Sequence, residues 1–249
     1  MSNSLSFNGT DLSTYGLIVT NESAAAFRQL VDFVQLPDAA YPFGATREAK
    51  SISLDIAITG SSYANVQSKL DAIKRILNQR ASKHLILDVQ DDRYYNAQFI
   101  SLGGAYKSPR AFIGNLDFTC PDPVAHSTTE TSSDFNINAD PKTVTETTGG
   151  TDYIKPIYTL TAGEALNDVT IKVECVETEE ELQWTGSLAS TEKLMVDVIN
   201  WIVRKEGSTS MATVVGQFPR LLPGITNHIK ITGFGTTGAL NISYRNCFL

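Results

Sequence analysis

Residues 51–77 read SISLDIAITGSSYANVQSKLDAIKRIL, and this stretch decides the fold class because its hydrophobic period changes within it. In the first part every second position is aliphatic, at Ile52, Leu54, Ile56 and Ile58. Such alternation predicts a strand with one buried and one solvent-facing side, as in an antiparallel sheet. After Gly60 the aliphatic residues follow one helical stripe, at Val66, Leu70, Ile73 and Leu77. The sequence therefore predicts a helix over residues 62–79, capped by Ser61 or Ser62.

The segments around this stretch complete an α+β block. Residues 24–46 contain Pro37 and Pro42 and indicate a long excursion, interpreted as a hairpin with irregular edges. Period two resumes after the helix at Leu85, Leu87 and Val89. Strands are then predicted over 94–102 and 112–118, joined by turns at Gly103-Gly104 and Ser108-Pro109. The block ends at Pro121-Asp122-Pro123.

The second half of the chain is predicted to be a β-sandwich. Residues 126–152 are interpreted as the crossing between domains plus a peripheral strand over 135–137. Short alternating segments follow, containing Val169, Ile171, Val173 and Cys175, then Leu194, Val196 and Val198, then Leu240, Ile242 and Tyr244. Alternating strands with Gly and Pro turns between them are typical of a sandwich. The predicted fold is thus mainly β, with an α+β domain over 1–125 and a sandwich over 126–249.

Composition excludes several function classes. The 249 residues carry a formal net charge of −7, which argues against a protein that wraps nucleic acid, because such binding needs Lys and Arg. No segment has the roughly 20 apolar residues of a membrane helix, and the N-terminus lacks a secretory signal. We expect the chain to be made in a cytoplasm, and we expect it not to insert into a membrane. Three distant cysteines predict buried, reduced thiols, and the scattered His84, His126 and His228 predict no zinc site.

Three motifs imitate functional sites. Residues 233–238 read GFGTTG, a literal match to the dinucleotide fingerprint, but strands are predicted on both sides, so we interpret them as a hairpin loop. The acidic run over 174–182 lacks the spacing of a calcium loop and is interpreted as a solvated turn. Asp91-Asp92 beside Arg93 predicts a turn in which the charges pair. With no nucleophile elbow, zinc motif or phosphate loop, we expect no enzyme, no catalytic or metal-binding residues and no cofactor.

Aromatic residues in the second half have two interpretations. They either pack the core of the sandwich or stack on a sugar, and they are Tyr153, Tyr158, Trp184 and Trp201. Trp201 follows Val198 and is expected to continue that strand or to begin a short helix. For the sugar-binding alternative, the candidate ligand residues are Trp184 and Trp201.

The order of segments resembles the distal tail proteins (Dit) of phages with long non-contractile tails. The first half contributes FNGTDLSTYGLIV (7–19), SISLDIAITG, LDAIKRILN, DDRYYNAQF and LDFTCPDP. The second half contributes TGGTDYIKPIYTL, ELQWTGSL, LMVDV and FPRLLPGITNHIKITG. The resemblance implies a tail-tube-like split β-barrel or sheet with one flanking helix over 1–125, and a galectin-like sandwich over 126–249. Some members of this family carry an arm or carbohydrate-binding insertions, but this sequence contains no extra segment long enough for one, which argues against host binding by this chain itself.

The resemblance also implies a function. Distal tail proteins are structural virion components that form a hexameric ring at the tail tip, made in the host cytoplasm. The ring joins the tail tube to the host-adsorption apparatus and leaves a channel for DNA. Expected partners are the tail-tube, tail-associated hub and tape-measure proteins and receptor-binding proteins. Six copies at −7 would carry −42, which suggests an acidic channel wall. The alternative is a carbohydrate-binding or adhesin module that acts through the sandwich.

Overall fold

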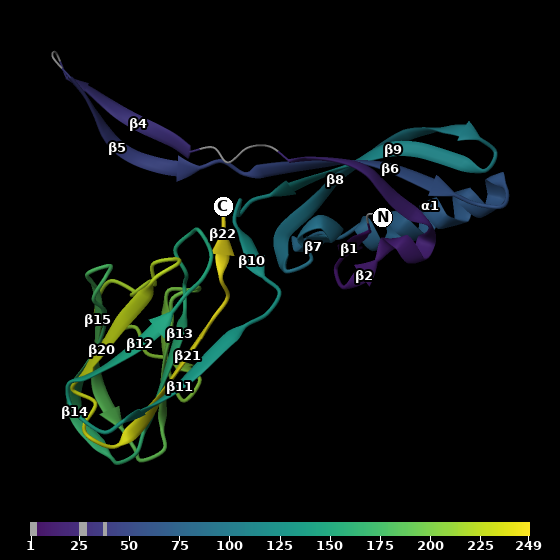
Figure 1. The fold of residues 1–249 in the computed structure, drawn as a ribbon. Coiled ribbons are helices and arrows are strands. Elements are labelled where there is room, and N and C mark those ends of the chain that lie inside the picture. The colour runs from purple at the N-terminus through teal and green to yellow at the C-terminus, as the bar shows by residue number, and fades with distance from the viewer. Residues whose placement is uncertain (1–3, 25–28, 37–38) are drawn as a thin grey trace. The chain divides into compact units, whose positions relative to one another are not determined.

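The computed structural model describes all residues except 1–3, 25–28 and 37–38 (Figure 1). The chain divides into two compact units, an α+β unit (Met1–Thr128 with Leu249) and a sandwich unit (Thr129–Phe248). Strands dominate both units, and the helices are confined to the first, so the predicted mainly β fold class is confirmed. In the described part of the chain, no helix is long and apolar enough to cross a membrane.

The α+β unit is built on an antiparallel sheet with the strand order β2-β1-β7-β8-β9-β6-β3. Its strands and helices are β1 (Leu5–Phe7), β2 (Thr10–Asp11), η1 (Leu12–Tyr15), β3 (Leu17–Ala24), β4 (Gln29–Leu36), β5 (Ala39–Arg47), β6 (Lys50–Thr59), α1 (Tyr63–Leu77), β7 (Lys83–Leu87), η2 (Asp88–Gln90), β8 (Arg93–Ser108), β9 (Ala111–Cys120) and β10 (Ala125–Ser127). The long strand β8 connects two parts of the sheet: its beginning pairs with β7 and its remainder with β9.

The predicted strand and helix of residues 51–77 are confirmed. Strand β6 buries Ile52, Leu54, Ile56 and Ile58, and helix α1 buries Val66, Leu70, Ile73 and Leu77. The Ser62 hydroxyl caps the helix by accepting a hydrogen bond from the Asn65 backbone N–H at 3.3 Å. Helix α1 packs against η1, β6 and β9, and covers one side of the sheet (Figure 1). The core of this unit therefore lies between α1 and the inner side of β6 and β9.

Two local predictions in this unit were wrong. Gly103-Gly104 is not a turn but part of β8, where Gly104 lies opposite Gly114 of β9. A Cβ atom on Gly104 would lie 2.5 Å from the Ile113 carbonyl oxygen, so glycine is needed for close strand approach. Strand β7 ends at Leu87, and Val89 is exposed in η2 because the chain turns there.

The predicted hairpin over residues 24–46 is present in the described residues. Strand β4 pairs with β5 in antiparallel register, with an irregularity between Asp32 and Phe33. Pro42 lies opposite Phe33, next to this irregularity. Pro37 and residues 25–28 lie outside the described residues.

The sandwich unit consists of two antiparallel sheets with strand orders β11-β21-β13-β16-β17-β18 and β12-β20-β14-β15-β19. Its strands are β11 (Thr131–Ile137), β12 (Lys142–Thr147), β13 (Ile157–Ala162), β14 (Leu166–Cys175), β15 (Glu180–Leu188), β16 (Lys193–Asp197), β17 (Ile202–Lys205), β18 (Ser208–Thr209), β19 (Val214–Gly216), β20 (Thr226–Thr232) and β21 (Gly238–Tyr244). The short strand β22 (Cys247–Phe248) belongs to neither of these two sheets. Alternate residues of both sheets are buried, as predicted for a sandwich. Residues 131–147 are not a simple crossing, because they supply one edge strand to each sheet, β11 and β12.

Candidate functional site

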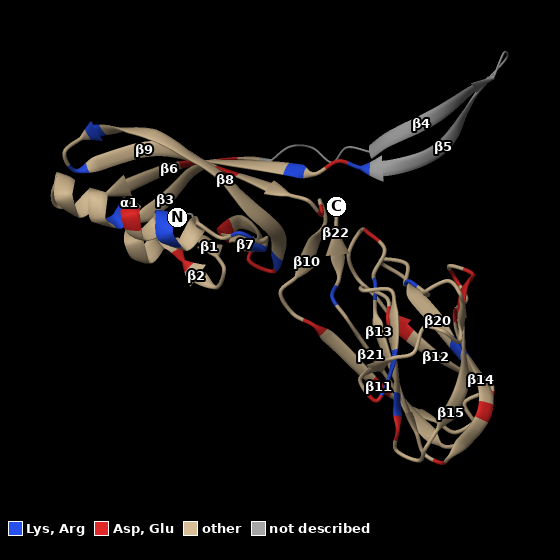
Figure 2. Cartoon of the chain, turned by 180° about the vertical axis from the view of Figure 1, so that it is seen from behind, with Lys and Arg blue, Asp and Glu red and all other residues tan. Residues whose placement is uncertain are grey.

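The side of the α+β sheet that α1 does not cover forms a small-residue polar surface, here called the open face. The alternation of β6 and β9 and the register with β3 and β8 define its members. They are Ile18, Asn21, Ser23, Ser51, Ser53, Asp55, Ala57, Thr59, Gln98, Ser101, Gly103, Ala105, Ser108, Ala111, Ile113, Asn115, Asp117 and Thr119. None of these residues is Lys or Arg, and two carry carboxylates. Figure 2 shows where the charged residues lie along these strands.

Asp117 is the best-anchored carboxylate of the open face. It accepts hydrogen bonds from the Ser101 hydroxyl at 2.6 Å, the Ser53 hydroxyl at 2.7 Å and the Asn115 side-chain amide at 3.0 Å. These three donors come from β8, β6 and β9, so the carboxylate links three neighbouring strands. The bonds from Ser101, then Ser53, lower the pKa of Asp117 below its usual value, against the opposing effect of partial burial.

The lowered pKa of Asp117 predicts a pH dependence of stability. The ionised carboxylate stabilises the fold at neutral pH, and this contribution is lost as the pH falls through the folded-state pKa. We expect Asp117→Asn to be less stable than the wild type by up to about 1 kcal/mol at pH 7 because solvent screens the site. The difference should shrink as the pH falls through the lowered folded-state pKa of Asp117. Urea unfolding at several pH values measures this difference. Ser101→Ala should reduce the same pH dependence, and a pH-independent difference for Asp117→Asn would contradict the assignment.

Net charge is distributed unequally between the two units. Residues 1–128 contain 12 acidic and 11 basic side chains, a net charge of −1, whereas residues 129–249 contain 15 and 9, a net charge of −6. The net charge of −42 calculated for six whole chains therefore comes mainly from the sandwich units and does not describe the α+β units. An acidic surface in this unit depends on local placement, as on the open face, rather than on total charge.

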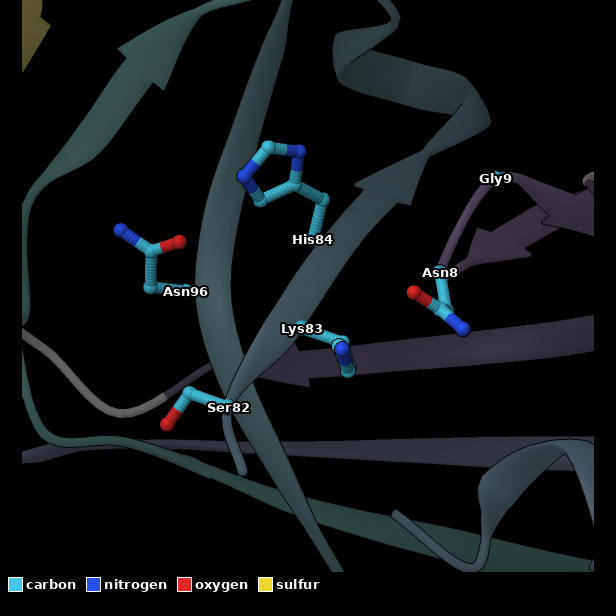
Figure 3. A pocket seen from close by; sticks show the side chains of 6 residues that line it. All are labelled: Asn8, Gly9, Ser82, Lys83, His84 and Asn96. Carbon is cyan, nitrogen blue, oxygen red and sulfur yellow. The ribbon is translucent and has the colours of Figure 1, made fainter. Parts of the chain in front are cut away.

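A shallow depression of about 310 Å³ lies beside the β1–β2 turn and the start of β7 (Figure 3). Its lining is polar and contains no carboxylate, with side chains or backbone of Asn8, Gly9, Ser82, Lys83, His84 and Asn96. The His84 ring stacks on Tyr94 at 3.9 Å, and the Tyr94 ring lies 5.6 Å from that of His126. The fold thus brings together two histidines that are far apart in sequence. Among the described residues, no group of three His, Cys, Asp or Glu side chains could hold a metal ion.

The two tryptophans have opposite environments. Trp184 of β15 is 2% exposed, and its indole N–H donates to the Ser210 hydroxyl at 2.9 Å, so it is a core residue. Trp201 is 52% exposed and lies in the turn between β16 and β17. The expectation that Trp201 continues a strand or begins a helix was wrong, because its φ of 56° turns the chain back. Tyr158 is fully buried, whereas Tyr153 is 41% exposed.

The acidic run over 174–182 is not merely a solvated turn. Glu180 is buried and forms a bidentate ion pair with the Arg220 guanidinium, which also lies over the Tyr153 ring at 4.6 Å. Glu177 accepts hydrogen bonds from the backbone N–H of His228 at 2.7 Å and contacts its ring at 2.5 Å. Partial burial opposes ionisation of Glu177, but these bonds outweigh it and lower its pKa. Sequence analysis missed these partners because they lie 40 or more residues away.

The structure also shows the surroundings of the glycine-rich loop, of the Asp92–Arg93 pair and of the three cysteines. Residues 233–238 join two strands without a helix, as expected, but β20 and β21 belong to different sheets, so the hairpin prediction was wrong. Arg93 binds the Asp92 carboxylate through two hydrogen bonds, as predicted. The three cysteines are buried and form no disulfide with one another, and burial raises the pKa of Cys120 to about 11. Such thiols are poorly reactive.

The comparison with known proteins identifies the fold. No protein-family model and no curated protein matches the sequence. The crystal structure of phage SPP1 Dit superposes with a TM-score of 0.80 and covers 100% of both chains, at 12% identity. The chain has the SPP1 Dit fold. That protein is described as a paradigm of the hub adsorption apparatus in phages that infect Gram-positive bacteria.

This chain also aligns with chains of the phage P2 baseplate in its activated conformation. The structure with Ca aligns over 99% of this chain and 98% of that chain, with a TM-score of 0.49 and 8% identity. The structure with Sr aligns over 97% of each chain, with a TM-score of 0.46 and 8% identity. The expected distal-tail resemblance is confirmed at the level of the fold by SPP1 Dit.

Proposed function

We propose that this chain is a structural virion protein, a distal tail hub at the tail tip of a phage. In this proposal residues 1–125 form a tail-tube-like ring domain and residues 126–249 a galectin-like sandwich. Six copies close into a ring that joins the tail tube to the host-adsorption apparatus. Partners of the ring are the tail-tube, tail-associated hub and tape-measure proteins, with receptor-binding proteins attached outside. The chain is proposed to be neither an enzyme nor a membrane protein.

The observation that carries the proposal is the full-length likeness to SPP1 Dit. A likeness that spans both units, with a TM-score of 0.80, supports a hub more specifically than a likeness to one unit would. Both units would then be used, one for the ring and one for attachment. At 12% identity the fold is shared while the surface residues differ, so receptor and host are left to experiment.

The open face supports a position along the DNA channel. A wall without Lys or Arg gives phosphates no cation to bind, and two carboxylates in each copy, Asp55 and Asp117, repel them. Most of the uncharged side chains on it are small, with Ile18 and Ile113 as the exposed large apolar exceptions. The near-neutral charge of residues 1–128 allows six copies to approach closely without strong mutual repulsion. We propose that the open face lines the channel.

The solution mass tests the ring directly. Six chains of 27.1 kDa give about 163 kDa, which we expect from light scattering, with six-fold rings and a central hole in negative-stain images of the same fractions. A monomer at every soluble concentration would contradict a self-closing ring, as would a ring with a different number of copies. An open-face double variant, Asp55→Asn with Asp117→Asn, serves as the control that should leave the mass unchanged.

A further inference from the structure

Three strands of the α+β unit meet at the polar depression shown in Figure 3. Strand β7 places His84 directly opposite Asn96 of β8, and the Asn8 backbone N–H donates to the His84 carbonyl at 2.9 Å. The turn between β1 and β2 therefore lies beside the start of β7. The lining residues of the depression, about 310 Å³ in volume, are Asn8, Gly9, Ser82, Lys83, His84 and Asn96.

Four of the lining side chains have no protein partner among the described residues. They form neither a hydrogen bond nor an ion pair there, and they are the side chains of Asn8, Ser82, Lys83 and Asn96. Asn8 and Ser82 are exposed, and Lys83 and Asn96 are half-buried. Their ammonium, amide and hydroxyl groups are therefore open to water or to a ligand.

The chain that leads into the depression is basic. Residues 72–87 contain no Asp or Glu, and their basic residues are Lys74, Arg75, Arg80 and Lys83. Lys74 and Arg75 lie in the last turn of α1, where cations stabilise the C-terminus of a helix. Helix α1 ends at Leu77, so this effect does not account for Arg80 and Lys83.

Arg80 and Lys83 form a pair of cations without a carboxylate partner. Three residues separate them along the chain, so their Cα atoms lie at most about 11 Å apart. Within the described residues, Arg80 also makes no ion pair. Asp11 follows the β1–β2 turn, but its carboxylate accepts hydrogen bonds from the Ser13 backbone N–H at 2.9 Å and hydroxyl at 2.8 Å. Asp11 does not line the depression.

We propose that this depression binds a dianionic phosphate group, either inorganic phosphate or a phosphate monoester. Ionised phosphate oxygens accept hydrogen bonds, and the lining offers ammonium, amide and hydroxyl donors without a carboxylate. A phosphate monoester carries about −1.5 to −2 charge at pH 7, which matches the two cations Arg80 and Lys83. The depression is shallow, so an ester substituent extends into solvent.

Other classes of small ligand fit this lining less well. A metal cation would be repelled by Lys83 and would find no carboxylate in the depression. A pyranose sugar stacks on Trp, Tyr or Phe, and none of these residues lines the depression. A phosphodiester carries one negative charge for each phosphate and matches two cations less well than a dianion does.

Titration calorimetry on the full-length protein tests the site with three probes: inorganic phosphate, glycerol 3-phosphate and dimethyl phosphate. Low salt is used because ions screen exposed charges. We expect a Kd of about 1 mM for at least one of the two dianions, and binding at least about tenfold weaker for the singly charged dimethyl phosphate. Tighter binding of glycerol 3-phosphate than of inorganic phosphate identifies an ester as the ligand, and the reverse identifies the free ion.

Three variants define the expected losses of affinity. Lys83→Gln should weaken binding about tenfold or more, because it removes the cation that lines the depression. Arg80→Gln should weaken it about threefold, because this charge is exposed and screened. Asn96→Ala should also weaken it about threefold through the loss of one hydrogen bond. Circular dichroism verifies that each variant is folded.

Lys107→Gln is the matched control for Lys83→Gln. It removes the same charge from an exposed position near the other end of β8, so the affinity for phosphate should be unchanged.

Three results would overturn the proposal. The first is that neither dianion binds at about 10 mM, ten times the expected Kd. The second is that dimethyl phosphate binds as tightly as the dianions. The third is an equal loss in Lys83→Gln and Lys107→Gln, which would indicate general attraction to a positive surface. The proposal does not depend on the hub function, because phosphate binding and ring mass are measured separately and each can fail alone.

Discussion

A Gly114→Ala variant should lose about 3 kcal/mol of unfolding free energy from the α+β unit. A Cβ atom on Gly114 would lie 2.0 Å from the Gly103 carbonyl oxygen and 2.8 Å from the Phe112 ring. The nearest atom belongs to the backbone of the paired strand β8, so it cannot move aside as a flexible side chain would. Strands β8 and β9 must separate locally, and overpacking of this kind costs about 1–3 kcal/mol or more. Urea unfolding followed by circular dichroism measures the loss.

Gly9→Ala provides the control for this prediction. Gly9 has a φ of 74°, but no atom lies within 4 Å of an added Cβ. Its replacement should therefore cost only the conformational penalty of a left-handed residue, about 1–2 kcal/mol. Equal losses in the two variants would contradict the role of close strand approach at Gly114.

Trp184→Ala should destabilise the sandwich unit by about 3–5 kcal/mol, the usual cost of removing a large buried aromatic side chain. The ring is 2% exposed and lies against Gly186, where a Cβ atom would be 2.5 Å from it. Its loss also leaves the Ser210 hydroxyl without the indole donor at 2.9 Å. Thermal unfolding by calorimetry should show a lower Tm for the sandwich transition and an unchanged one for the α+β unit.

The second tryptophan is the matched comparison. Trp201→Asn loses the contact with Phe218 but relieves the left-handed strain of a bulky residue, and these two effects oppose each other. We expect a net change within about 1 kcal/mol. A loss at Trp201 as large as that at Trp184 would show that the exposed ring is mainly structural.

Periodic patterns made much of the fold predictable. The alternation of β6, the stripe of α1 and the cap at Ser62 depend on neighbours within a few residues, so the sequence contains all the information needed. The alternating strands of the sandwich were recognised for the same reason. The cysteine spacing predicted buried thiols without disulfides, because isolated cysteines behave as small apolar side chains.

Features that depend on distant partners were not predictable. Gly103-Gly104 has the composition of a turn, and only the position of Gly114 across the sheet shows that close approach is what requires glycine. The GFGTTG loop has the same glycine pattern whether its two strands share a sheet or not. Glu180 looks like any member of an acidic run until Arg220, 40 residues away, is placed beside it.

The candidate site residues show the same limit. The sequence alone does not distinguish Trp184 from Trp201. Trp184 is buried because of its position in strand β15, whereas Trp201 is exposed because it lies in a left-handed turn. The alternation in β6 predicted which of its polar residues face solvent, and these residues belong to the open face. Their meeting around Asp117 required the register with β8 and β9.

The pairing of the outer strands of the sandwich sets an order of events during translation. Ser132 of β11 meets Asn241 of β21, 109 residues later, and β12 must likewise wait for β20. At about 5–20 residues per second, β11 leaves the ribosome roughly 5–20 s before its partner exists. The strands β1 to β9 can pair among themselves much earlier. A nascent chain should therefore expose two unpaired strands, and chaperone capture or aggregation during synthesis should concentrate on residues 131–147.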